Sequence, residues 1–147
     1  MNFKKIVVPF AFSLLTVLLP VVSNGQCKGY AKKSCLPKVA PFTHNGQLNS
    51  ATLVAGQKVQ LEMTFYSGQN YRIVVCAQDV LGKVDFRLLD ADKNVVFDSH
   101  ENNSPDHWDF NLKSTQQLFV EVSVPKSDAP NGIVSNGCVA LLVGFKN

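Results

Sequence analysis

Hydrophobic and polar residues alternate along much of the chain after residue 57. In the range 58–65, Val59, Leu61, Met63 and Phe65 are separated by polar residues, which is the two-residue period of a strand with one buried face. The same period recurs in 84–88, 108–112 and 118–124, and a short apolar run at 95–97 follows a turn. The ranges 71–77 and 137–145 are apolar at nearly every position, as expected for central strands covered on both faces.

These segments predict seven strands after residue 57, and one or two weaker strands between residues 39 and 54. Turn residues such as Asn, Asp, Gly and Pro separate them at short intervals, and no segment shows a sustained helical period of 3.6 residues. We therefore expect an all-β fold, an antiparallel β-sandwich or jelly roll of about eight strands. The range 26–41 has no period and is expected to form an irregular, disulfide-tied extension.

The first 25 residues have the three parts of a secretory signal peptide. Lys4 and Lys5 precede an apolar run over 6–22, and Ser23-Asn24-Gly25 supplies small residues for cleavage. An uncleaved anchor and a lipoprotein signal are the alternatives, but the run is short and contains two prolines, and Gln26 stands immediately before Cys27 where a lipoprotein needs a small residue. We expect a signal peptide at 1–25, an extension with the first weak strands at 26–55, and the sandwich body at 56–147, with 26–147 forming one domain.

Export changes how composition and charge are interpreted. Removing the first 25 of 147 residues leaves 122, enough for one domain with a sizeable core. Without Lys4 and Lys5 the formal net charge falls from +3 to +1, so nothing indicates a nucleic-acid partner or binding to an anionic membrane. We expect a secreted or periplasmic protein with no membrane span after cleavage.

All four cysteines follow the expected cleavage point. An even number in an oxidising compartment predicts two disulfides, with three possible connectivities for Cys27, Cys35, Cys76 and Cys138. Cys27 and Cys35 lie close together in a segment that resembles a loop, whereas Cys76 and Cys138 lie in strands. The simplest pairing is therefore Cys27–Cys35 and Cys76–Cys138. The closely spaced Cys and His pairs that a structural zinc site needs are absent.

A series of short motifs extends over about two thirds of the chain: Gly56-Gln57-Lys58-Val59-Gln60-Leu61, Tyr71-Arg72-Ile73-Val74-Val75, the stretch 85–96 around Asp90-Ala91-Asp92-Lys93-Asn94, Val120-Glu121-Val122 and the closing run 139–144. Together these motifs resemble the pre-peptidase C-terminal type of secreted bacterial β-sandwich. The resemblance implies a non-catalytic domain of the kind appended to secreted hydrolases. As a whole, the chain also resembles small secreted proteins of Bacteroidota type.

Two acidic segments are weak candidates for metal binding. Asp90, Asp92, Asn94, Asp98 and Glu101 match positions 1, 3, 5, 9 and 12 of a calcium loop, but Val95 stands at position 6, where that loop needs glycine. An ordinary hairpin turn explains the same residues, and calcium binding of another type at the rim of the sandwich is the alternative. A second loop contains Asp98, His100, Glu101, Asp106 and His107, with Pro105 between the histidines. We expect a solvated loop there, no cofactor and no metal.

Aromatic residues offer a more plausible route to binding. Trp108 at a strand start and Tyr66 beside a turn are candidates for a glycan-binding platform, although Trp108 alternates in phase with Phe110 and Leu112, which favours the core. Catalytic motifs are missing, since no Gly-x-Ser-x-Gly elbow or phosphate loop is present. The sequence thus predicts a non-enzymatic binding or accessory module for an extracellular protein or glycan. The alternative is a small secreted hydrolase that uses strand-face carboxylates such as Asp85 and Asp109.

Overall fold

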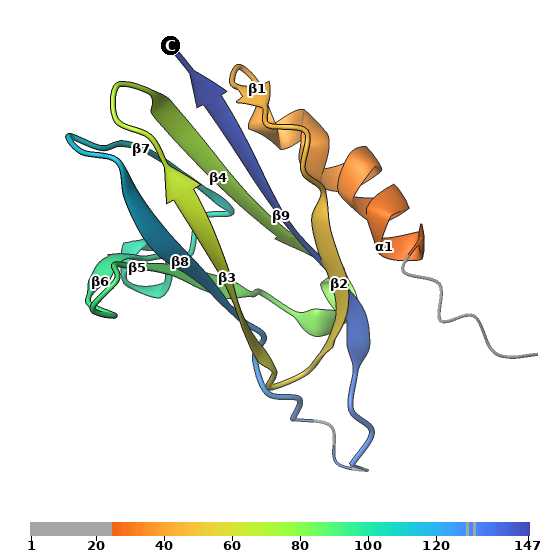
Figure 1. Cartoon of the computed structure of the whole chain (residues 1–147). Coiled ribbons are helices and arrows are strands. Elements are labelled where there is room, and N and C mark those ends of the chain that lie inside the picture. The colour runs from red at the N-terminus through yellow and green to blue at the C-terminus, as the bar shows by residue number, and fades with distance from the viewer. Residues whose placement is uncertain (1–24, 129, 131) are drawn as a thin grey trace, which may run out of the picture.

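Nine strands form two antiparallel sheets in the part of the chain that the computed structural model describes, which is residues 25–128, 130 and 132–147 (Figure 1). Sheet A contains β1 (Thr43–His44), β2 (Asn49–Val54), β4 (Asn70–Ala77), β7 (His107–Asn111) and β9 (Asn136–Lys146). Sheet B contains β3 (Lys58–Phe65), β5 (Asp85–Leu89), β6 (Val95–Asp98) and β8 (Gln116–Ser123). The predicted all-β sandwich is confirmed, and the predicted signal peptide lies almost wholly outside the described residues.

The strand pairs are nested. β2 pairs with β9, β3 with β8, β4 with β7, and β5 with β6, all antiparallel. Each pair joins one early and one late strand, and successive pairs alternate between the sheets. This is the strand order of a jelly roll. It leaves β2 near one edge of sheet A and β3 at one edge of sheet B.

The main core fills the space between the two sheets. Inward-facing side chains from both sheets pack there, among them Phe65, Ile73, Phe86, Leu88 and Leu118, each at most 1% exposed. The alternation predicted for β3 and β8 is therefore confirmed, because every second side chain of β8 enters this core and Val59, Met63 and Phe65 of β3 pack with it, whereas Leu61 stays 36% exposed.

A helical segment covers the outer face of sheet A, where an irregular extension was predicted. It begins with α1 (Gly25–Tyr30), continues through the π-helical turn η1 (Ala31–Cys35) and ends with the 3₁₀ turn η2 (Leu36–Val39). Cys27, Ala31, Cys35 and Val39 are all buried, at intervals of four residues. They form the inner stripe of this segment, and Val74, Cys76, Ala140 and Leu142 of β4 and β9 complete a second small core beneath it. Two other 3₁₀ turns, η3 (Asp79–Leu81) and η4 (His100–Asn102), lie between strands.

Arg72 fastens the end of the helical segment to the sheet. Its Nη1 donates to the Ala40 carbonyl at 2.6 Å, while Nε and Nη2 donate to the two Asp109 carboxylate oxygens at 2.7 Å each. The guanidinium also lies 4.8 Å from the ring centre of Phe42. Within the described residues, no helix is long and apolar enough to cross a membrane.

Candidate functional site

The cysteine pairing predicted from spacing is wrong. Cys27 is bonded to Cys138, with their Cα atoms 5.1 Å apart, and this excludes both Cys27–Cys35 and Cys76–Cys138. Cys35 and Cys76 are free thiols, and both are buried. The prediction failed because Cys27 and Cys35 belong to one helical segment, in which residues eight apart point the same way but lie too far apart to bond.

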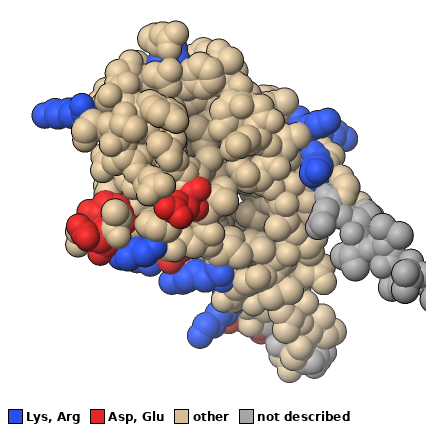
Figure 2. Space-filling view, in the orientation of Figure 1, with Lys and Arg blue, Asp and Glu red and all other residues tan. Residues whose placement is uncertain are grey.

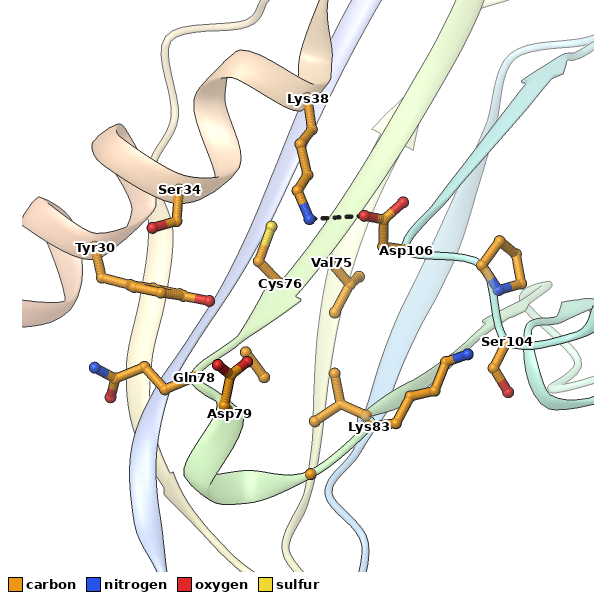
Figure 3. Close-up of a pocket in the computed structure, with 14 residues that line it drawn as sticks. Tyr30, Ser34, Lys38, Val75, Cys76, Gln78, Asp79, Lys83, Ser104 and Asp106 are labelled. Carbon is orange, nitrogen blue, oxygen red and sulfur yellow. Dashed lines mark hydrogen bonds and ion pairs between the residues drawn. The ribbon is translucent and has the colours of Figure 1, made fainter.

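A pocket of about 570 Å³ opens where the helical segment meets β4 and two loops (Figure 3). The helical segment contributes Tyr30, Ser34 and Lys38, and Cys76 lines the strand side. The Nζ atom of Lys38 lies 2.7 Å from Asp106 Oδ2, so an ion pair spans the opening. Figure 3 shows the Cys76 sulfur on the side of β4 that faces the helical segment, near the Lys38 ammonium group.

Burial and charge change the acidity of the groups around this pocket. Burial raises the pKa of Tyr30 to about 12, and nearby Cys35 adds to the effect, so its hydroxyl stays protonated. The hydrogen bond to Asp106 raises the pKa of Lys38. Partial burial opposes ionisation of Asp106, but hydrogen bonds from Lys38 and His107 outweigh it and lower its pKa. The pocket therefore holds neutral hydroxyl groups and the Lys38–Asp106 ion pair, and Lys83 and Asp79 also line it.

The polar groups of the turn at Asp90, Asp92 and Asn94 form hydrogen bonds with one another. Asp90 Oδ1 accepts hydrogen bonds from the backbone N–H groups of Asp92 at 2.9 Å and Asn94 at 2.8 Å, and its Oδ2 accepts one from the Asn94 amide at 3.0 Å. The Asn94 contacts lower the pKa of Asp90. These are the local bonds of an Asx-type hairpin turn, which occupy the oxygens that a calcium ion would need.

The acidic and histidine side chains of the second loop separate into pairs. His100 Nδ1 lies 3.3 Å from Asp85 Oδ2, whereas His107 Nδ1 lies 2.8 Å from Asp106 Oδ1. Among the described residues, no group of three or more His, Cys, Asp or Glu side chains is placed to hold a metal ion. The two strand-face carboxylates of the hydrolase alternative lie on different sheets, since Asp85 belongs to β5 and Asp109 to β7.

Trp108 and Tyr66 are in different surroundings. The Trp108 ring is half-buried and lies nearly parallel to the rings of Phe97 and Phe110, at centroid distances of 4.3 and 4.7 Å. Tyr66 is 61% exposed, just after the end of β3. A glycan platform that uses Trp108 stays a prediction, and sugar stacking there would have to compete with two aromatic neighbours.

The open side of the sandwich, between β2 and β3, carries a site that the sequence did not suggest. The two strands diverge after a tight connection (Figure 1), and a slot of about 400 Å³ separates them. Its floor comes from β8 and β9 and its lining is mainly apolar: Leu48, Leu53, Val59, Leu61, Val120, Val122, Val139 and Leu141. Figure 2 shows that uncharged residues cover most of the molecular face seen in this orientation.

One polar atom on the slot side of β2 has no partner among the described residues. Asn49 Nδ2 is buried and makes no hydrogen bond within this part of the chain. Ser50 Oγ is also without a partner there, but Ser50 lies opposite Ala140 on the face of β2 that points toward the helical segment. A buried donor without an acceptor costs about 1–3 kcal/mol. The β2 wall of the slot therefore favours a ligand that brings hydrogen-bonding groups as well as apolar surface.

Comparisons with known proteins show the fold and no closer relationship. No protein-family model and no curated protein matches the chain, so the resemblance to pre-peptidase C-terminal domains stays a hypothesis. Among solved structures, the chain is similar to Aeromonas hydrophila PliG, a periplasmic lysozyme inhibitor of g-type lysozyme. The TM-score is 0.52 at 9% identity, covering 72% of this chain and 89% of that one. Salmonella Typhimurium PliG also matches, with a TM-score of 0.41 at 12% identity over 68% and 86% of the two chains.

Proposed function

We propose that the protein is a non-catalytic binding module, exported to the periplasm or the cell exterior, whose partner is another protein. The partner contributes an extended segment that pairs with the free edge of β3 and places apolar side chains in the slot. One observation carries this proposal: β3 is an eight-residue edge strand beside an open, apolar slot. Strand addition to an exposed sheet edge is a common mode of peptide recognition.

The orientation of the β3 backbone suits such pairing. The Val124 N–H donates to the Gln57 carbonyl at 2.9 Å, in register with the β3–β8 ladder. Bonded and non-bonded pairs alternate in antiparallel sheets, so the even-numbered residues of β3 direct their N–H and C=O groups away from β8. Four residues, Lys58, Gln60, Glu62 and Thr64, thus offer unpaired backbone groups at this edge.

The inward side chains of β3 support the same binding mode. Leu61 is 36% exposed although its cross-strand neighbour Val120 is 1% exposed. An added strand would cover Leu61 and bring peptide groups toward the side chain of Asn49. A glycan would satisfy the Asn49 amide but leave the apolar wall uncovered, so the slot favours a peptide.

Two further observations support an exported protein-binding role. A disulfide such as Cys27–Cys138 persists in oxidising compartments, and the structurally similar Aeromonas hydrophila PliG is a periplasmic inhibitor of a protein, g-type lysozyme. The hydrolase alternative receives no comparable support. We expect the mature chain to begin at Gln26, which intact-mass measurement of the exported protein would establish, and a retained Met1 would contradict export by this route.

The test uses a displayed library of random peptides long enough to span β3, with g-type lysozyme as a second probe. Peptides selected on the wild-type protein should bind Glu62→Pro roughly tenfold or more weakly, because proline removes an outward N–H without touching the β8 ladder. Glu62→Ala is the matched control, since it keeps that N–H, and should bind almost as well as the wild type. Failure to select any peptide, or equal binding by the two variants, would contradict the proposal.

A further inference from the structure

We propose that Cys35 and Cys76 form a second disulfide in the exported protein, and that an external disulfide makes it by exchanging first with Cys76 from the pocket. The bond would link the helical segment to β4, as Cys27–Cys138 already links it to β9.

The fold places the two sulfurs together. Cys35 on η1 and Cys76 on β4 belong to the same small core, at 0% and 5% exposure, and each thiol shifts the pKa of the other through a direct interaction. Cys27 lies two helical turns before Cys35 on the same stripe. On the sheet, Cys76 stands opposite Ala140, two residues from Cys138. The known disulfide therefore sets the register that brings the second pair together.

The two thiols differ in access and in acidity. Cys76 lines the pocket, whereas Cys35 is covered completely. The hydrogen bond from Cys35 lowers the pKa of Cys76, and the nearby Lys38 ammonium group lowers it further, against the effect of burial. The same hydrogen bond and burial raise the pKa of Cys35. Since the thiolate is the attacking species, Cys76 is the nucleophile of the first step.

Two exchange steps complete the reaction, with an external low-molecular-weight disulfide as the oxidant. The Cys76 thiolate attacks one sulfur of that disulfide, forming a mixed disulfide and releasing one thiolate, which takes up a proton. The Cys35 thiol then loses its proton and attacks the Cys76 sulfur, releasing the second thiol. The protein loses two electrons and two protons, and the oxidant gains both.

The first measurement requires no variant. The protein is exported into an oxidising periplasm, denatured without reduction and treated with iodoacetamide, and its peptides are mapped by mass spectrometry. We expect no alkylated cysteine and a cross-linked pair of peptides that contain Cys35 and Cys76. Two alkylated thiols per chain, persisting after incubation with oxidised glutathione, would overturn the proposal.

The order of steps is tested with two matched variants and oxidised glutathione. Cys35→Ser should accumulate a mixed disulfide on Cys76, because the second thiol is missing. Cys76→Ser should react at least roughly tenfold more slowly in its folded state, because Cys35 is inaccessible, and both variants should react alike in urea. Equal rates in the folded proteins would refute the entry of the oxidant through the pocket.

Discussion

Substituting Gly144 by alanine tests the docking of the helical segment on sheet A. Gly144 lies on β9 beneath the end of this segment, and a Cβ atom added there would lie 2.5 Å from Val39 Cγ1 and 2.7 Å from Phe42 Cβ. Carbon atoms in good contact are about 3.5–4.0 Å apart, so the chain at 39–42 must move by about 1 Å. Phe42 Cβ is tied to the backbone and cannot rotate away.

This movement of residues 39–42 lowers the free energy of unfolding by an amount that can be estimated from the contacts it disturbs. Overpacking a well-packed site costs about 1–3 kcal/mol. The displacement would also strain the bond from Arg72 to the Ala40 carbonyl and the pairing of His44 with Gly144. We expect Gly144→Ala to lower the free energy of unfolding by about 2–3 kcal/mol, or the melting temperature by roughly 8 °C or more.

Urea unfolding followed by fluorescence of the single tryptophan measures this loss, with hydrogen exchange of residues 25–39 as a local readout. Gly29→Ala is the matched control: no atom lies within 4 Å of the place that its new Cβ would take, and alanine in α1 should stabilise by about 0.5–1 kcal/mol. If Gly144→Ala were as stable as the wild type, with unchanged exchange, the close approach of the segment to β9 would be refuted.

Three other variants test separate parts of the fold. Replacing Cys27 and Cys138 by serine should lower the free energy of unfolding, measured in urea, by up to about 4–5 kcal/mol. The reason is that the bond spans a separation of 111 residues and so restricts the unfolded chain strongly; a loss below about 1 kcal/mol would contradict this. The hydrogen bond from Arg87 lowers the pKa of Glu121 below its ordinary value of 4.5, so ionised Glu121 stabilises the fold at neutral pH and that stability is lost as pH falls through the lowered pKa. Glu121→Gln should therefore show a shallower fall of stability in acid, and an unchanged pH profile would contradict this. Trp108→Ala should lower the free energy of unfolding by about 3 kcal/mol, whereas lost glycan binding with an unchanged melting temperature would instead support a sugar platform.

The sandwich could be predicted from the sequence because alternation reports burial directly. All seven strands expected after residue 57 are present as β3 to β9, and the two weaker ones are β1 and β2. The ranges 71–77 and 137–145 were correctly placed at the centre of a sheet. Their second apolar face is buried for a reason that alternation does not show, since a helical segment covers it.

The helical segment was missed because its composition hides its period. Gly29 and Pro37 favour a loop on propensity, and four lysines in the same segment lower its apolar content. The signal that was present is the spacing of four between Cys27, Ala31, Cys35 and Val39. Two of these positions are cysteines and one is alanine, so the stripe lacks the large aliphatic side chains that usually mark the buried face of a helix, although short side chains allow a helix to approach a sheet closely.

The slot could not be predicted, because it depends on the divergence of two strands. Val59 and Leu61 have the pattern of core residues, and the sequence gives no sign that the opposing strand β2 lies too far away to cover them. Edge position is a property of topology. It follows from the nested pairing of β2 with β9 and β3 with β8.

The cysteine spacing contains more information once the helix is recognised. Residues eight apart in a helix lie roughly 12 Å apart along its axis, beyond the limit of about 7 Å for a disulfide. Cys27 therefore bonds to the sheet, at Cys138, and Cys76 is the cysteine left for the bond that we propose for Cys35. The neighbouring positions of Cys76 and Cys138 on β4 and β9 provide two partners for one helical stripe. A cysteine pair at a spacing of eight, followed by single cysteines in two apolar strands, thus favours a helix bonded to a sheet rather than a tied loop.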